Sequence, residues 1–112
     1  MSETLQSWVE QAVAIPGVLA VGARGPDHSV LARSSYDEFS AAKIEEVLRE
    51  IAETFRLLEQ NRMAAARLRW TLEIGWLHAF VFSDGTLIAL LITKGAGSSP
   101  ELERLLGSLA PQ

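Results

Sequence analysis

The sequence predicts a single α+β domain with the element order α-β-β-α-β-β-β-α. Three observations support this fold class. Apolar residues recur at helical spacing in three segments, five short segments are apolar or alternate between apolar and polar, and turn-forming residues separate those short segments. Because long connections occur only around the central helix, neighbouring strands are expected to pair as antiparallel hairpins. Residues 1–112 show neither a repeat nor a linker, so we expect one domain.

The first helix is predicted over residues 3–14, and Pro16 ends it because the proline ring disfavours the helical conformation at the preceding residue. Two short apolar runs follow, over residues 17–23 and 29–33, on either side of a Gly-Pro-Asp turn. This pattern predicts a β-hairpin. One face of the helix carries Leu5, Trp8, Val9, Ala12 and Val13.

The longest element is a helix predicted from Ser40 to Asn61 or a little beyond. Phe39 and Ile44 flank Ser40 with the spacing of a hydrophobic staple around a serine N-cap. At 1.5 Å per residue the helix spans roughly 30 Å, which is the width of a small domain. Its apolar face consists of Ile44, Val47, Leu48, Ile51, Phe55 and Leu58.

The third predicted strand has one apolar and one polar face. Leu68, Trp70, Leu72, Ile74 and Trp76 alternate with Arg67, Arg69, Thr71, Glu73 and Gly75. This period of two is typical of a strand that is buried on one side. We expect the turn into the fourth strand, residues 77–82, at Gly75-Trp76.

The remaining elements follow from one turn signal and one apolar run. Asp84-Gly85 lies between two apolar segments and predicts a tight hairpin. Residues 87–93 are apolar on both faces, which places this strand in the centre of the sheet. A last helix is predicted after Ser98 or Ser99, with Pro100 in its first turn and one apolar side formed by Leu102, Leu105, Leu106 and Leu109.

Composition and charge exclude several functional classes. The chain has no cysteine, which excludes disulfide scaffolds, thiolate metal sites and cysteine nucleophiles. Its net charge of −4 argues against nucleic-acid binding. No uncharged stretch reaches the ~18–20 residues of a membrane helix, and a basic region typical of a signal peptide is absent. We expect a cytoplasmic protein that binds no nucleic acid and does not insert into membranes.

No group of residues in the sequence assembles an active site, so we expect a protein that is not an enzyme. His28 and His78 are its only histidines and lie on different elements, too few ligands for a metal centre. Asp27-His28-Ser29 contains the residue types of a catalytic triad, but contiguous turn residues cannot align them. We therefore predict no catalytic residue, no metal ligand and no cofactor.

The third strand suggests a partner. It has only the fourth strand as a local neighbour, so we expect it at an edge of the sheet, and a long apolar edge favours pairing with another chain. Charged residues on its polar face are the alternative protection of such an edge. The simplest assembly is a C2 homodimer with one continuous ten-stranded sheet.

Four arginines lie between the end of the long helix and the third strand: Arg56, Arg62, Arg67 and Arg69. One interpretation is structural, with cations near a helix C-terminus and on a solvated strand face. The other is a docking patch for an acidic partner. The sequence leaves both interpretations open.

The element order and several local patterns resemble the roadblock/dynein light chain family. The matching segments are Ile15-Pro-Gly-Val-Leu-Ala-Val-Gly22, the long helix at 44–58 and the strand region at 70–92. The resemblance covers about residues 5–109 and consists of hydrophobic patterns with Gly and Asp-Gly turns. The first hairpin turn, Arg24-Gly-Pro-Asp-His28, departs from the Asp and Gly that members often have there.

The resemblance implies a five-stranded antiparallel sheet with the long helix on one face and the other two helices on the opposite face. It also implies homodimers that join through the third strand with the long helices side by side. The predicted interface is then Phe55, Leu58, Leu68, Trp70, Leu72 and Ile74.

In function, the resemblance implies a non-catalytic scaffold or regulator, of the bacterial type that acts on Ras-like small GTPases. No GTPase-contact residue carries over to this chain. Two alternatives remain: a generic dimerisation adaptor, and a small-molecule-sensing module of the PAS or GAF kind. A sensing module requires a cavity with convergent polar groups.

Overall fold

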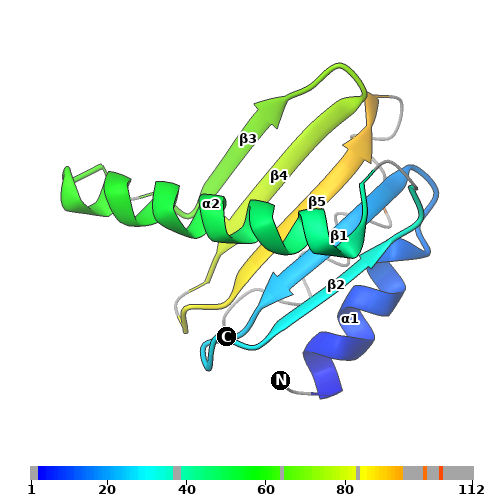
Figure 1. Ribbon diagram of the computed structural model, residues 1–112, viewed down its shortest axis with the longest axis horizontal. Helices are drawn as coiled ribbons and strands as arrows, with labels where there is room; N and C mark the ends of the chain where they lie inside the picture. The colour runs from blue at the N-terminus through cyan, green and yellow to red at the C-terminus, as the bar shows by residue number, and fades with distance from the viewer. Residues whose placement is uncertain are drawn as a thin grey trace.

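Two helices and one five-stranded antiparallel sheet make up the described part of the chain (Figure 1). The computed structural model describes residues 3–36, 39–63, 65–82, 84–94, 100 and 104. The elements are α1 (Glu3–Val13), β1 (Val18–Arg24), β2 (Val30–Ser34), α2 (Ala41–Gln60), β3 (Arg67–Thr71), β4 (Gly75–Val81) and β5 (Leu87–Thr93). This confirms the α+β class and the order of the first seven predicted elements. The predicted last helix lies outside the described residues, apart from Pro100 and Arg104, and stays a prediction.

The strands are arranged in the order β2-β1-β5-β4-β3, and every neighbouring pair is antiparallel. The apolar strand β5 occupies the centre, as its sequence predicts, because both of its faces are buried. β3 and β2 form the two edges of the sheet within the described chain. The prediction that β3 is an edge strand is therefore confirmed.

The two helices pack on opposite faces of the sheet, each over its own apolar cluster. In β5, Ile88, Leu90 and Ile92 belong to the cluster of α1, whereas Leu87 and Leu91 belong to the cluster of α2. α1 lies over β1 and β2, and α2 crosses β1, β2 and β5. The placement of these two helices agrees with the expectation from the family resemblance.

A serine cap and a close approach to the sheet fix the N-terminal half of α2. The Ser40 hydroxyl accepts a hydrogen bond from the backbone N–H of Lys43 at 3.4 Å, as the predicted N-cap requires. Gly22 of β1 lies directly beneath the helix, where an added Cβ would be 2.5 Å from Cγ2 of Ile44. A residue without a side chain at position 22 therefore sets how closely α2 approaches the sheet.

The turn between β3 and β4 differs from its predicted position. Leu72 and Gly75 exchange backbone hydrogen bonds of 2.8 and 3.3 Å, so the turn consists of Glu73 and Ile74 rather than Gly75-Trp76. Gly75 already belongs to β4, where it pairs with Thr93 of β5. A Cβ at this position would lie 1.8 Å from the carbonyl oxygen of Ile92. Gly75 therefore allows β5 to approach β4 closely. From the sequence alone, a glycine with this role cannot be distinguished from a glycine in a turn.

This shift also corrects the predicted apolar face of β3. Trp76 lies in β4 opposite Thr71, and Ile74 is exposed in the turn. The apolar row of the edge is therefore Leu68, Trp70 and Leu72. It is shorter than the row of five residues that the sequence predicts.

Candidate functional site

The strongest candidate site is the open edge of β3 together with its apolar side. The side chains of Leu68, Trp70 and Leu72 are half-buried and pack against the cluster beneath α2. The helix makes its main contacts with β1, β2 and β5, so it leaves this row incompletely covered. A long edge with half-exposed apolar side chains is the kind of surface that another chain can pair with.

Further exposed apolar side chains flank this edge along the chain. Leu57 in α2 is 58% exposed, Met63 in the connection to β3 is 61% exposed, and Ile74 in the β3–β4 turn is 39% exposed. Among the described residues, Val30 on β2 is the other large apolar side chain that is exposed. Exposed apolar surface therefore concentrates on the segments immediately before and after β3.

The other face of β3 is cationic and aromatic. The guanidinium of Arg67 lies 4.9 Å from the ring centroid of Phe80, and that of Arg69 lies 5.8 Å from the ring centroid of Trp76. His78 stacks beside Phe80 with a centroid distance of 6.3 Å. These cation–π contacts hold both arginines against β4.

The structure therefore divides the four arginines of the predicted docking patch. Arg67 and Arg69 share the face of β3 that points away from α2. Arg56 lies on α2 and forms an ion pair with Glu53, one turn earlier. Arg62 follows the helix with a φ of 59°. Only Arg67 and Arg69 form a compact cationic pair, and whether an acidic partner docks there stays a prediction.

The predicted dimer interface also includes two residues of α2. Phe55 is only 8% exposed and belongs to the core beneath α2. Leu58, one turn later, is half-buried. Phe55 therefore has a role within the protomer, and contact of either residue with a second copy stays a prediction.

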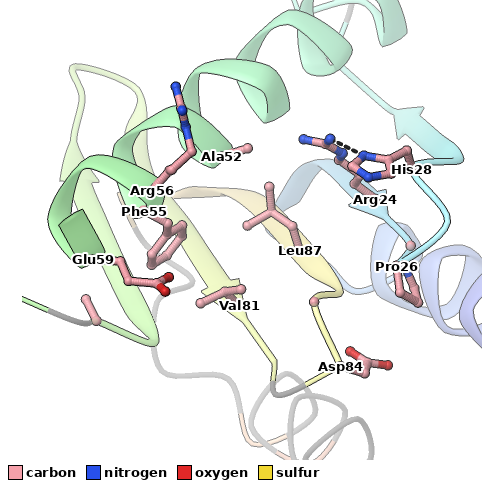
Figure 2. Close-up of a pocket in the computed structure, with 13 residues that line it drawn as sticks. Arg24, Pro26, His28, Ala52, Phe55, Arg56, Glu59, Val81, Asp84 and Leu87 are labelled. Carbon is pink, nitrogen blue, oxygen red and sulfur yellow. Dashed lines mark hydrogen bonds between the residues drawn. The ribbon is translucent and has the colours of Figure 1, made fainter.

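A second candidate site is a cavity of about 540 Å³ next to the C-terminal half of α2 (Figure 2). It lies between the β1–β2 turn, the β4–β5 turn and the helix. Phe55, Val81 and Leu87 form its apolar floor and point toward one another. The polar lining side chains are Arg24, His28, Arg56, Glu59 and Asp84.

Hydrogen bonds fix two of the polar groups around the cavity. Nη2 of Arg24 contacts Nδ1 of His28, which the sequence places in a solvated turn. His28 has a φ of 68°, a left-handed conformation in which histidine is found more often than most residues. The backbone N–H of Thr86 donates to Oδ1 of Asp84 at 2.8 Å, and this bond lowers the pKa of the Asp84 carboxyl below its ordinary value.

The described residues were also compared with the requirements of a metal centre and of a membrane-spanning helix. They contain no cluster of three or more His, Cys, Asp or Glu side chains that could hold a metal ion. Neither of the two described helices is both long and apolar enough to cross a membrane.

No known family matches. Family models give no match to this chain, and neither do the curated proteins. The interpretation of both candidate sites therefore depends on the geometry of this chain.

Sequence reasoning identified the edge strand but missed the cavity. The long helix before this strand was the signal for the edge, because it leaves the strand only the fourth strand as a local neighbour. The cavity lining comes from two turns and one helix that are far apart in the sequence, and no local pattern unites them. Only the arrangement of α2 over the sheet brings these segments together.

Proposed function

We propose that the protein is a non-catalytic homodimeric scaffold whose two copies join through the edges of β3. The observation that carries this proposal is the open β3 edge with its half-buried row of Leu68, Trp70 and Leu72. Antiparallel pairing of two such edges about a two-fold axis covers this row and creates one continuous sheet. Isologous pairing of this kind is the commonest form of homo-oligomer.

The opposite edge of the sheet is a poorer site for pairing. β2 and β3 have five residues each, but Arg33 on β2 forms an ion pair of 2.7 Å with Glu10 of α1. Beyond β2, the hydroxyl of Ser35 donates to the carbonyl of Leu19 in β1 at 3.3 Å. Charged side chains are one of the devices that protect sheet edges in monomers. This contrast favours β3 as the interface.

The dimer can be tested by matched substitutions on the two edges. Light scattering is expected to give twice the chain mass of 12.2 kDa for the wild type. Leu72→Arg places an uncompensated charge in the proposed interface and should yield monomers, whereas Val30→Arg on the β2 edge should remain dimeric. Circular dichroism spectra verify that both variants fold.

The result that contradicts the proposal is a wild-type mass of 12.2 kDa at all protein concentrations. Equal dimerisation of folded Leu72→Arg and Val30→Arg would also contradict it. In the second case the interface would have to lie elsewhere on the surface.

We further propose that the dimer binds or regulates a Ras-like small GTPase. This step is supported by the resemblance in element order. The test is affinity capture with Ras-like GTPases encoded near this protein, followed by single-turnover GTP hydrolysis with and without the dimer. Absence of both binding and a change in hydrolysis rate would contradict the GTPase role and leave the homodimer intact.

Small-molecule sensing is a second candidate function, and the cavity beside α2 favours it. Its volume of about 540 Å³ lies within the usual range for ligand pockets, roughly 300–1,000 Å³. A bound ligand raises the melting temperature, because it binds only the folded state. A thermal-shift screen should then find a stabilising compound, and Ala52→Trp, which fills the cavity, should abolish that shift. A screen without stabilising compounds would argue against sensing.

A further inference from the structure

We propose that two copies of β3 pair in one particular register, with Trp70 facing Trp70 of the partner subunit beside the two-fold axis. This inference rests on the proposed homodimer and specifies how its strands align. The argument uses the hydrogen bonds of β3, the symmetry of the pairing and the charges along the strand.

The hydrogen bonds to β4 determine which backbone groups of β3 face outward. Leu72 and Gly75 exchange both of their backbone hydrogen bonds, which makes them a bonded pair of the ladder. Bonded and non-bonded pairs alternate along an antiparallel ladder, so Trp70 also directs its backbone groups toward β4. Arg69 and Thr71 therefore direct their N–H and C=O groups toward the open edge, where a second copy can bond to them.

Two-fold symmetry restricts the pairing to a few registers. A two-fold axis perpendicular to the sheet keeps each face of the sheet continuous. Each residue must therefore lie opposite a partner residue whose side chain points to the same face. Because the sides alternate along a strand, the axis must pass beside a single residue, which then faces its own copy. An axis at Arg67 or Thr71, the two ends of β3, pairs fewer residues of the strand than an axis nearer its middle. Leu68, Arg69 and Trp70 are the remaining positions.

Charge disfavours two of these three positions. An axis at Leu68 places Arg67 opposite Arg69 of the partner subunit, and symmetry repeats this contact. An axis at Arg69 places its guanidinium opposite its own copy. Like charges directly opposite each other destabilise a strand pair. Both arginines lie over aromatic rings of β4, so turning them aside would weaken those cation–π contacts.

An axis at Trp70 removes the repulsion and introduces an attraction. Arg69 then faces Thr71 of the partner subunit, and their outward backbone groups can exchange two hydrogen bonds. Arg67 comes next to Glu73 in the β3–β4 turn of the partner subunit, so each end of the pairing brings opposite charges together. Opposite charges across a strand pair stabilise the pairing.

The same register completes the apolar face. Trp70 lies opposite its own copy, and Leu68 lies opposite Leu72 of the partner subunit. These are non-bonded positions, where Cα atoms are about 4.5 Å apart and side chains make their closest contact. Every side chain of the half-buried row thus gains an apolar neighbour.

Cysteine cross-linking tests the register directly, because the wild-type chain has no cysteine. Under mild oxidation Trp70→Cys should form a covalent dimer, since a Cα separation of about 4.5 Å lies within the disulfide range. Arg69→Cys and Val30→Cys should give little covalent dimer. Preferential cross-linking through Arg69→Cys would overturn the proposed register in favour of the axis at Arg69.

A charge-exchange pair tests the same register without removing the tryptophan. Arg67→Glu and Glu73→Arg should each raise the dimer dissociation constant roughly tenfold, because each acts at two symmetric contacts. The double variant should restore dimerisation to near the wild-type level. If the protein dimerises but shows neither this rescue nor cross-linking at position 70, the proposed register is wrong and the homodimer still stands. A monomeric wild type would overturn the homodimer as well.

Discussion

Asp84 shows how one side chain can define a turn. The β4–β5 turn contains Gly85 with a φ of 94°, and the Asp84 carboxylate accepts the backbone N–H of Thr86. This bond stabilises the ionised carboxylate and therefore lowers the pKa of Asp84 in the folded protein. The Asp-Gly signal in the sequence thus has its physical basis in the hydrogen bond as well as in the glycine.

The lowered pKa of Asp84 predicts a pH-dependent contribution to stability. Its contribution is present above the ordinary pKa of 3.8 and is lost as the pH falls through the lower pKa of the folded state. Asp84→Ala should therefore lower the urea midpoint at pH 7 and lose this effect at pH values well below 3.8. The measurement is urea denaturation of both proteins from pH 7 to pH 2.5, and an equal difference at every pH would contradict the prediction.

The two buried glycines at strand interiors predict different tolerance of a methyl group. An added Cβ at Gly75 meets the backbone carbonyl of Ile92, whereas at Gly22 it meets the end of the Ile44 side chain. A side chain can shift, but the backbone of the central strand cannot do so without loss of pairing. We expect Gly75→Ala to lower the free energy of unfolding by about 3 kcal/mol or more, and Gly22→Ala by about 1–3 kcal/mol.

Urea denaturation at neutral pH measures both effects. Gly85→Ala serves as a control for the effect of positive φ. An added Cβ there meets no atom within 4 Å, so any decrease in the free energy of unfolding reflects backbone conformation alone. A smaller effect at Gly75 than at Gly22 would mean that β4 and β5 can separate more readily than their packing indicates.

At the scale of elements, local periodicity predicted most of the fold. The spacing of Ile44, Leu48 and Ile51 placed the buried face of α2 correctly, because a helix with one apolar stripe has one way to pack on a sheet. The β3–β4 turn was displaced by two residues, since Gly75 serves a contact between strands that are distant in sequence. Elements defined by their own pattern were predictable, and those defined by a neighbour were not.

The C-terminal half of α2 illustrates the same limit for the candidate sites. Its apolar pattern continues to Leu58 without a break, yet Phe55 is buried whereas Leu58, one turn later, is only half-buried. In Figure 1 this end of the helix projects past the sheet. Sequence spacing describes the stripe on a helix, but the position at which the sheet ends beneath it is a property of the assembled fold.

At the scale of the whole molecule, homodimer formation predicts that stability depends on concentration. Association with a second copy stabilises the folded state by mass action. The melting temperature of the wild type should therefore rise between micromolar and hundred-micromolar protein, whereas that of Leu72→Arg should stay constant. Differential scanning calorimetry at several concentrations measures this, and a constant wild-type melting temperature would argue against coupling of folding and dimerisation.

The difference between the two sheet edges also determines how far assembly can proceed. When β3 pairs with its own copy, both attractive edges are consumed, and the enlarged sheet ends in β2 on each side. The ion pair between Arg33 and Glu10 protects that strand. In the proposed dimer growth therefore stops at two copies, because pairing through β3 leaves no second β3 edge from which open-ended fibres could form.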